Sequence, residues 1–335
     1  MNFAEREAFY RQIEEERDTK VIAYVTGDRR NMETQIGADC IDIFIEKLDE
    51  IGPTKKISLV LHTNGGNTAA AWRLVNLIKS FCDEFEVIIP FTAMSAGTLI
   101  SLGAHNIVMT KQATLGPIDP SLNHPLGPSV KDGNQLARLS VSVEAVRGYL
   151  DAACLDLGIK DDSSLATILT DLSNKVHPLV LGEIFRSRAQ IRFLAEKLLN
   201  STMKDGEKIK PIVDFLCADS GSHDYTINRR EAKTLGLPVE KPTNEFYALL
   251  KSIQRSYSAE MKLAEPFNPL TLATAANGAP VQYKFVRAVI ESVDNGSHAF
   301  ISEGVMTRQV GPQQGPMPPQ QTIQDQRQFE GWRQI

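Results

Sequence analysis

Short apolar runs alternate with amphipathic ones through the first third of the chain. Residues 20–25 (KVIAYV), 56–62 (KISLVLH) and 85–91 (FEVIIPF) are typical of buried strands, because each is short, apolar and rich in β-branched side chains. Between them, residues 39–48 and 68–81 carry apolar side chains at helical spacing. Strands and helices in this order predict an α/β fold with a largely parallel sheet.

The alternation continues as far as residue 109 and then stops. A helix is predicted at residues 95–102 and a strand at 106–109. Residues 117–135 contain four prolines and two glycines, which is typical of an ordered loop or an insertion. Further elements are predicted from spacing and capping: helices at 142–157, 161–172, 178–199, 228–235 and 245–262, and a strand at 281–293.

This order of elements predicts one main domain with additions. We assign residues 1–242 to that domain and treat 120–172 as a loop and helical insertion within it. Residues 243–309 form a small C-terminal extension of helix and strand. Residues 310–335 are rich in Pro, Gln and Gly, so they bury too little apolar surface to offset chain entropy, and we expect a disordered or partner-docked tail.

Composition narrows the class of protein. With 335 residues, 42% hydrophobic content and 23% charged content, the chain has the makeup of a globular protein. Its net charge of −5 is spread, and no basic stripe suggests nucleic-acid binding. The four cysteines are far apart and form no CxxC pair, which favours a reducing compartment. No apolar run approaches the roughly 18 residues that span a bilayer, so we expect a cytoplasmic protein without a membrane span.

Thr63-Asn64-Gly65-Gly66 lies where a predicted strand meets a predicted helix. Consecutive glycines allow the backbone to approach a ligand closely, and N–H groups at a helix start favour an oxyanion or a phosphate. A plain tight turn is the alternative interpretation.

Ser95 lies at the next strand-to-helix junction, in the segment AMSAGT. A serine in such a turn is exposed, and the following N–H, that of Ala96, can point at the oxygen of a tetrahedral intermediate. An ordinary N-cap serine is the alternative. Because neighbouring parallel βα turns lie side by side, Gly65 and Ala96 are expected to converge on one carbonyl.

A nucleophilic serine needs a base, and the residues leave several candidates. Asp119 is a poor proton acceptor for serine and is expected to tie its loop. Lys175 and His177 stand at the start of the long helix, where a desolvated lysine or a histidine could take the proton. His223 and Asp224 precede another helix and could supply a base or an orienting carboxylate.

The segments LVLHTNGGNTAAAWRLVNLI, VIIPFTAMSAGTLISLGAHNIVM and TLGPIDP, in this order, resemble the serine dehydrogenase proteinase family. That family is a branch of the superfamily of the Clp protease subunit, signal peptide peptidase A and the crotonases. The resemblance is close over residues 57–120 and looser from 20 to 240. It implies a ClpP/crotonase-like spiral of ββα units with a helical insertion and a C-terminal extension.

The resemblance also implies roles for single residues. Ser95 would be the nucleophile, and the backbone of Gly65, Gly66 and Ala96 would form the oxyanion hole. Where the Clp subunit carries its catalytic histidine, this chain has a loop containing Gly116 and Asp119, expected beside the substrate. Relatives of signal peptide peptidase use a lysine near a later helix, which implies Lys175 as the base.

The implied function is that of a serine endopeptidase that forms an acyl-enzyme and needs no metal or other cofactor. Asp224 corresponds in position to the aspartate of the Clp subunit. Members of the Clp protease superfamily assemble into rings or stacks, so we expect a homo-oligomer that acts on a protein or peptide. The tail at residues 310–335 has a possible partner of its own. Two alternatives remain open: an inactive scaffold of the same fold, and an acyl-CoA enzyme of crotonase type.

Overall fold

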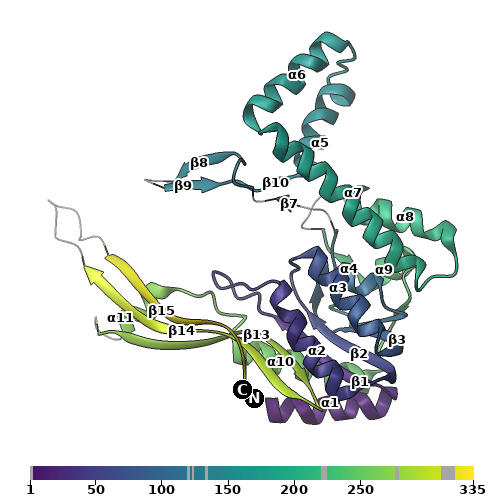
Figure 1. Cartoon of the computed structure of the whole chain (residues 1–335), viewed down its shortest axis with the longest axis vertical. Coiled ribbons are helices and arrows are strands. Elements are labelled where there is room, and N and C mark those ends of the chain that lie inside the picture. Colours follow the sequence, from purple (N-terminus) through teal and green to yellow (C-terminus); the bar gives the residue numbers. More distant parts are fainter. Residues whose placement is uncertain are drawn as a thin grey trace. The chain divides into compact units, whose positions relative to one another are not determined.

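The computed structural model describes residues 3–118, 121–122, 124–132, 135–219, 225–275, 279–310 and 321–335 (Figure 1). The chain divides into two compact units. The first unit consists of Met1–Leu115, Asn228–Lys233 and Leu237–Ile335. The second unit consists of Gly116–Ile227 and Thr234–Gly236.

An eight-stranded sheet forms the centre of the first unit, in the order β12-β5-β3-β2-β1-β13-β14-β15. The strands from β12 to β1 run parallel and the last three are antiparallel. Their bounds are β1 Lys20–Thr26, β2 Thr54–His62, β3 Cys82–Ile89, β5 Asn106–Met109, β12 Val239–Glu240, β13 Val281–Ser292, β14 Gly296–Val310 and β15 Gln321–Gln334. The predicted α/β class with a largely parallel sheet is confirmed.

Helices cover both faces of this sheet (Figure 1). Helices α1 (Phe3–Arg17) and α10 (Asn244–Met261) share one buried core with side chains of β1, β2, β3 and β13. Helices α2 (Ile41–Ile51), α3 (Thr68–Lys79) and α4 (Ala96–Leu102) belong to the other face, where Tyr24 of β1 meets Phe44 with ring centres 5.5 Å apart. Because successive strand residues point to opposite faces and both faces are covered, the buried parts of the parallel strands are mostly apolar.

The C-terminal part of the chain belongs to the same sheet. β13 pairs with β1, and β14 carries β15 at the sheet edge. The expectation of disorder for residues 310–335 is therefore wrong for 321–334, while 311–320 lie outside the described residues. Trp332 explains part of the order: it packs edge-on against Phe300 at 5.7 Å, and its Nε1 donates to Asp39 at 2.8 Å.

The second unit is mainly helical and is larger than the insertion predicted at residues 120–172. Its small core joins Val143 and Val146 of α5 to Val180 and Ile184 of α7. Its main elements are β7 Ser121–Leu122, β8 Ser129–Asp132, β9 Gln135–Arg138, β10 Val141–Ser142, α5 Val143–Asp151, α6 Asp162–Lys175, α7 Pro178–Asn200 and α8 Ile209–Asp214. No helix among the described residues is long and apolar enough to span a membrane.

Several short elements complete the description of the chain. They include one-turn helices at Ala38–Cys40 and Gly206–Lys208 and π-helical turns at Ala152–Asp156 and Phe215–Asp219. The remaining strands and helices are β4 Thr92–Ala93, β6 Thr114–Leu115, β11 Ile227–Asn228, α9 Arg229–Thr234 and α11 Pro269–Ala275.

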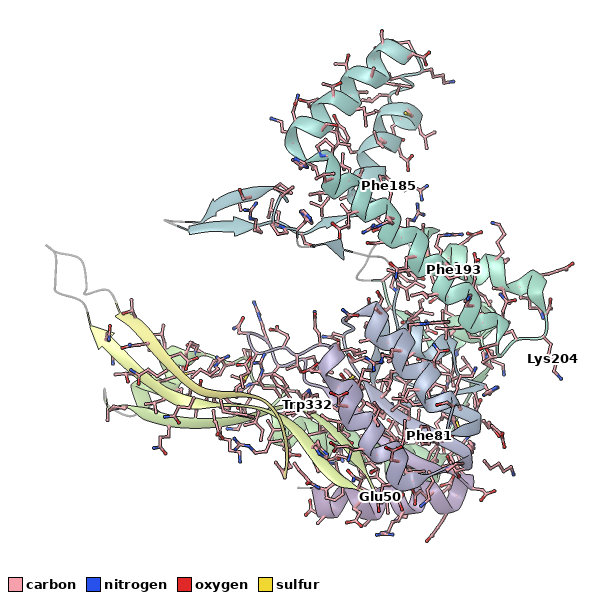
Figure 2. All side chains as sticks on the ribbon, viewed as in Figure 1. Glu50, Phe81, Phe185, Phe193, Lys204 and Trp332 are labelled. Atoms are coloured by element: carbon pink, nitrogen blue, oxygen red, sulfur yellow. The ribbon has the colours of Figure 1, made fainter. Side chains whose placement is uncertain are left out.

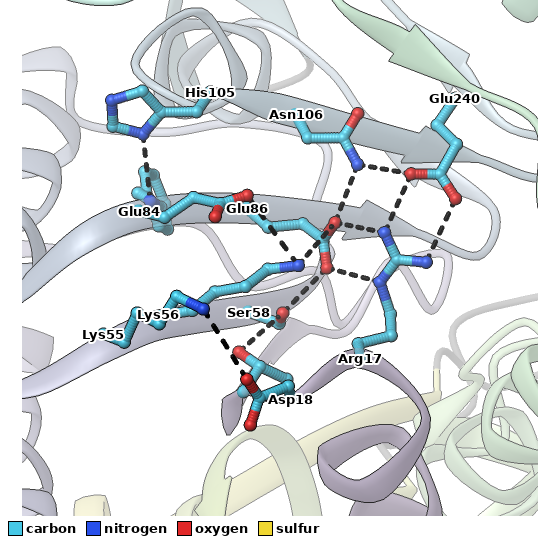
Figure 3. A network of polar contacts seen from close by, with 12 residues as sticks. Arg17, Asp18, Lys55, Lys56, Ser58, Glu84, Glu86, His105, Asn106 and Glu240 are labelled. Carbon is cyan, nitrogen blue, oxygen red and sulfur yellow. Dashed lines mark hydrogen bonds and ion pairs between the residues drawn. The ribbon is translucent and has the colours of Figure 1, made fainter.

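A polar network joins α1 to three neighbouring parallel strands (Figure 3). Arg17, the last residue of α1, donates through Nε to Glu86 at 2.7 Å and through both terminal nitrogens to Glu240. Asn106 donates to both carboxylates, at 2.7 and 2.6 Å. Burial alone would raise the pKa of Glu86, but the hydrogen bonds from Arg17 and Asn106 outweigh it and hold the pKa below its usual value. The network ties α1 to β3, β5 and β12.

Lys47 on α2 has a fully buried side chain whose Nζ donates to the carbonyl of Gly296 at 2.9 Å. Burial lowers the pKa of Lys47 to about 8. The unfolded chain keeps the ordinary lysine pKa of about 10.4, so it binds the Lys47 proton more tightly than the folded protein does. The free energy of unfolding therefore rises with pH between about 8 and about 10.4.

The variant Lys47→Met should lack this pH dependence. Between pH 7.5 and 9.5 the free energy of unfolding, measured by chemical denaturation, should increase by about 2 kcal/mol more for the wild type than for Lys47→Met. The exposed Lys55→Gln should follow the wild type, and parallel pH curves for wild type and Lys47→Met would contradict the assignment.

Candidate active site

The turn after β2 is held in a conformation that glycine favours. Gly65 has φ of +115° and Gly66 has φ of +143°. The N–H of Gly65 donates to Oγ1 of Thr63 at 3.0 Å, and the carbonyl of Gly65 accepts from the N–H of Ile36 at 2.8 Å. A Cβ on Gly66 would lie 2.4 Å from the carbonyl oxygen of Ile36, so no larger residue fits without a backbone shift. The turn is therefore a rigid backbone feature and not a loose loop.

Ser95 lies at a sharp turn between β4 and α4. Its φ of +51° and ψ of −111° fall in a region that residues other than glycine rarely occupy. The serine stands at the N-cap position, but its side chain makes no capping hydrogen bond, so the ordinary N-cap interpretation does not describe it. Backbone strain of this kind costs on the order of 1–3 kcal/mol and is concentrated at functional sites.

Backbone hydrogen bonds bring the two turns together. The N–H of Thr63 donates to the carbonyl of Thr92, and the N–H of Met94 donates to the carbonyl of Thr63, each at 3.0 Å. A Cβ built on Gly65 would lie 2.8 Å from Cβ of Ser95 and 3.3 Å from its Oγ. The glycine turn thus lies directly against Ser95, as the neighbouring parallel strands predicted.

Two N–H groups next to Ser95 can serve an anionic oxygen. Among the described residues, the N–H groups of Gly66 and Ala96 have no backbone or side-chain acceptor, whereas that of Gly65 is bonded to Thr63. The N–H of Gly65 is thus already engaged, and the expected oxyanion hole of Gly65, Gly66 and Ala96 stays a prediction. Ala96 is the first residue of α4, where a helix leaves its N–H unsatisfied and partly positive.

The predicted base residues fall into two groups. Lys175 ends α6 and is exposed, and His177 is the N-cap of α7, with Nδ1 accepting from the N–H of Leu179 at 3.2 Å; both belong to the second unit, as does the buried Gly116. Asp119, His223 and Asp224 lie outside the described residues. In the described part of the chain, no cluster of His, Cys, Asp and Glu side chains could hold a metal ion.

His62, which ends β2, was not assigned a role from the sequence. It is 5% exposed, its Nε2 lies 3.4 Å from Oδ2 of Asp28, and its ring stacks on Phe91. Burial would raise the pKa of Asp28, but His62 lowers it below its usual value. His62 and Tyr257 line a small apolar cavity on the face of the sheet that α10 covers. Thr63, the next residue, points to the opposite face of the sheet. In the sequence, the only indication of a role for His62 is its position at the start of the segment HTNGG.

The parallel sheet, the glycine turn and the strained serine together form a candidate active site on an α/β fold. Residues 1–136 match the family of ClpP-like SDH-type serine proteinases. This match confirms the family resemblance that the sequence showed for this part of the chain.

Similar proteins include two from Methanocaldococcus jannaschii. Uncharacterized protein MJ0137 is 34% identical over 199 residues, which cover 59% of this chain and 58% of that protein. Uncharacterized protein MJ1495 is 29% identical over 237 residues, which cover 68% of this chain and 69% of that protein. The chain therefore spans less than two thirds of the length of the first of these relatives.

Similar solved structures include two variants of the 1510-N membrane-bound stomatin-specific protease, one of them in complex with a substrate peptide. The first gives a TM-score of 0.38 at 16% identity and covers 64% of this chain and 79% of its own. The second, with the peptide, gives a TM-score of 0.37 at 17% identity and covers 63% of this chain and 74% of its own.

Proposed function

We propose that the protein is a serine peptidase that cleaves peptide bonds through an acyl-enzyme on Ser95. The observation that carries the proposal is the strained backbone of Ser95, which lies against the glycine turn with no capping bond to its side chain. The match of residues 1–136 to a serine proteinase family supports the same reaction class. A serine used only to cap α4 would need neither the strain nor the glycine turn.

The reaction begins with attack of Ser95 Oγ on the substrate carbonyl carbon. The N–H groups of Gly66 and Ala96 bind the oxygen as it becomes negative, which preorganised donors can do at low cost. A base takes the serine proton and returns it to the leaving amine as the C–N bond breaks. Water, activated by the same base, then hydrolyses the ester and restores Ser95.

Lys175 is our proposed base. Its Nζ would accept the serine proton and return it to the leaving amine. His177 is a weaker candidate, because Nδ1 already accepts the Leu179 N–H and the neutral ring therefore carries its proton on Nε2. His223 and Asp224 stay as an alternative base or orienting groups, and Asp119 and Gly116 would belong to the loop beside the substrate.

The homo-oligomer expected from the family also stays a proposal. The second unit exposes several large apolar side chains, which an assembly of copies would cover. Phe185 and Phe193 on α7 are 42% and 53% exposed (Figure 2). Leu157, which follows α5, is 76% exposed.

The test of the proposed function is labelling of the full chain by a fluorophosphonate, followed by intact mass. We expect one label per chain, and a labelling rate about 10²-fold or more slower in Lys175→Gln, since that is the usual contribution of a general base. Lys160→Gln, at an exposed lysine just before the other end of α6, should label at the wild-type rate, and His177→Ala nearly so. If His177→Ala loses labelling and Lys175→Gln does not, the histidine is the base; a folded wild type that never labels would favour the inactive scaffold.

A further inference from the structure

A second group of residues follows the carboxyl ends of the same parallel strands. β3 pairs with β5 and β5 with β12, so the segments after these strands leave one edge of the sheet. Ser95 is reached after β3, Lys111 follows β5 by two residues and Lys241 follows β12 directly. This edge is where open α/β sheets bind their ligands.

A short parallel ladder links Lys111 to the serine turn. β4 and β6 pair Thr92 with Thr114 and Ala93 with Leu115. Ser95 comes two residues after β4, and Lys111 three residues before β6. A polypeptide bound across Ser95 can therefore reach the surroundings of Lys111 with a neighbouring side chain.

A pocket of about 220 Å³ in the first unit is lined by three cationic side chains and no carboxylate. Its lining residues are Lys111, Arg229, Lys241, Pro242, Asn244 and Tyr247. Each of the three cations lacks an ion-pair partner among the described residues. Like charges gathered without counter-charges repel one another, so this arrangement favours an anion.

Neutral partners fix the walls of this pocket. Nζ of Lys111 lies 4.8 Å from the ring centre of Tyr247, a cation–π contact. The hydroxyl of Tyr247 donates to Oε1 of Gln112 at 2.8 Å, and Arg229 donates to the carbonyl of Met109 at 3.2 Å. Lys111 and Arg229 are thus held by neutral partners, which leave their charge uncompensated.

The start of α10 adds positive potential to the same pocket. Thr243 caps this 18-residue helix by accepting from Phe246 at 3.1 Å, and Asn244 is its first residue. The partial positive charge of a helix N-terminus adds to that of the side chains. Glu245, the acidic residue of this turn, is not among the lining residues.

We propose that this cationic pocket binds a carboxylate, and that its occupant is an acidic side chain of the polypeptide substrate a few residues from the scissile bond. The proposal rests on the proposed peptidase function and adds to it a preference among substrates. The three cations and the first turn of α10 would bind the carboxylate, and Tyr247 would contact its aliphatic stem.

The test measures binding, so that it does not depend on cleavage. Fluorescent peptides that place one Glu at successive positions are compared with matched Gln peptides on the full-length Ser95→Ala protein by anisotropy. We expect one Glu position to bind roughly three- to tenfold more tightly than Gln, in keeping with a few partly exposed charge pairs, and the preference to weaken with salt.

Charge-matched variants separate the pocket from general electrostatics. In the Ser95→Ala background, Lys111→Gln/Lys241→Gln should bind the Glu and Gln peptides equally. Lys55→Gln/Lys204→Gln removes the same charge and should keep the preference, because Lys55 lies at the amino end of β2 and neither lysine lines the pocket.

Two results would overturn the proposal. One is equal affinity for all Glu and Gln peptides. The other is thermal stabilisation by inorganic phosphate that Lys111→Gln/Lys241→Gln abolishes, without any Glu preference, which would make the pocket a free-anion site. Peptide hydrolysis by the wild type is measured separately. A preference for Glu without cleavage would refute the peptidase function and support the carboxylate pocket. Cleavage without a preference for Glu would support the peptidase function and refute the carboxylate pocket.

Discussion

Ser95→Ala is expected to abolish fluorophosphonate labelling and to lower peptide hydrolysis by a factor on the order of 10⁴ or more, as loss of a nucleophile does in serine proteases. The backbone of Ser95 has a φ of +51°, a conformation that serine rarely adopts. Its hydroxyl makes no capping bond, so its loss removes little that stabilises α4. The measurement is intact mass after labelling, beside hydrolysis of an unstructured polypeptide.

A matched control separates the nucleophile from serine loss in general. Ser80 is an exposed serine at the end of α3, and its hydroxyl donates to the carbonyl of Leu77 at 2.6 Å. Ser80→Ala should label at the wild-type rate. A Ser95→Ala protein that still takes up one label per chain would mean that another residue is the nucleophile. The free energy of unfolding of Ser95→Ala should stay within about 1 kcal/mol of the wild type, as for a substitution that breaks no buried bond.

The parallel part of the fold could be predicted because its strands are buried on both faces. Residues 20–25, 56–62 and 106–109 are predominantly apolar runs, and β1, β2 and β5 begin and end within two residues of them. The proximity of Gly65 to Ser95 followed from the same order, since turns after adjacent parallel strands meet at one edge.

Other parts of the fold carry no such local signal. Helix α1 is rich in Glu and Arg, and its buried Arg6 donates to the buried Glu291 of β13 at 2.9 Å, 285 residues further along the chain. Strand β15 is largely polar, because it forms the sheet edge. Both depend on partners remote in sequence, which hydrophobic periodicity does not report.

The site shows the same division between local and remote information. That Gly66 and not Gly65 has an available N–H depends on the side chain of Thr63, whose Oγ1 also accepts from Oγ1 of Thr26 at 2.7 Å. No pattern of glycines in the sequence distinguishes the two. The base is harder still to predict, because the proposed base, Lys175, lies in a different compact unit from Ser95.

Gly65→Ala is expected to slow fluorophosphonate labelling by about 10²-fold or more, although it removes no catalytic group. The new Cβ would lie 2.8 Å from Cβ of Ser95 and 3.2 Å from the carbonyl oxygen of Met94, so the serine turn must move. A displacement of about 1 Å at a reacting group costs a factor of this size. The φ of +115° adds backbone strain, and the free energy of unfolding should fall by about 2–4 kcal/mol.

Gly52→Ala provides the control that isolates the steric effect from the backbone effect. Gly52 follows α2 with φ of +68°, and a Cβ there would meet nothing within 4 Å. It should lose about 1–3 kcal/mol, because its φ of +68° and ψ of −179° fall in a region that essentially only glycine occupies, and it should label at the wild-type rate. If Gly65→Ala labels as fast as Gly52→Ala while folded, the contact between the glycine turn and Ser95 does not set the position of the nucleophile, and the reactive geometry must come from the segment around Met94 and α4 alone.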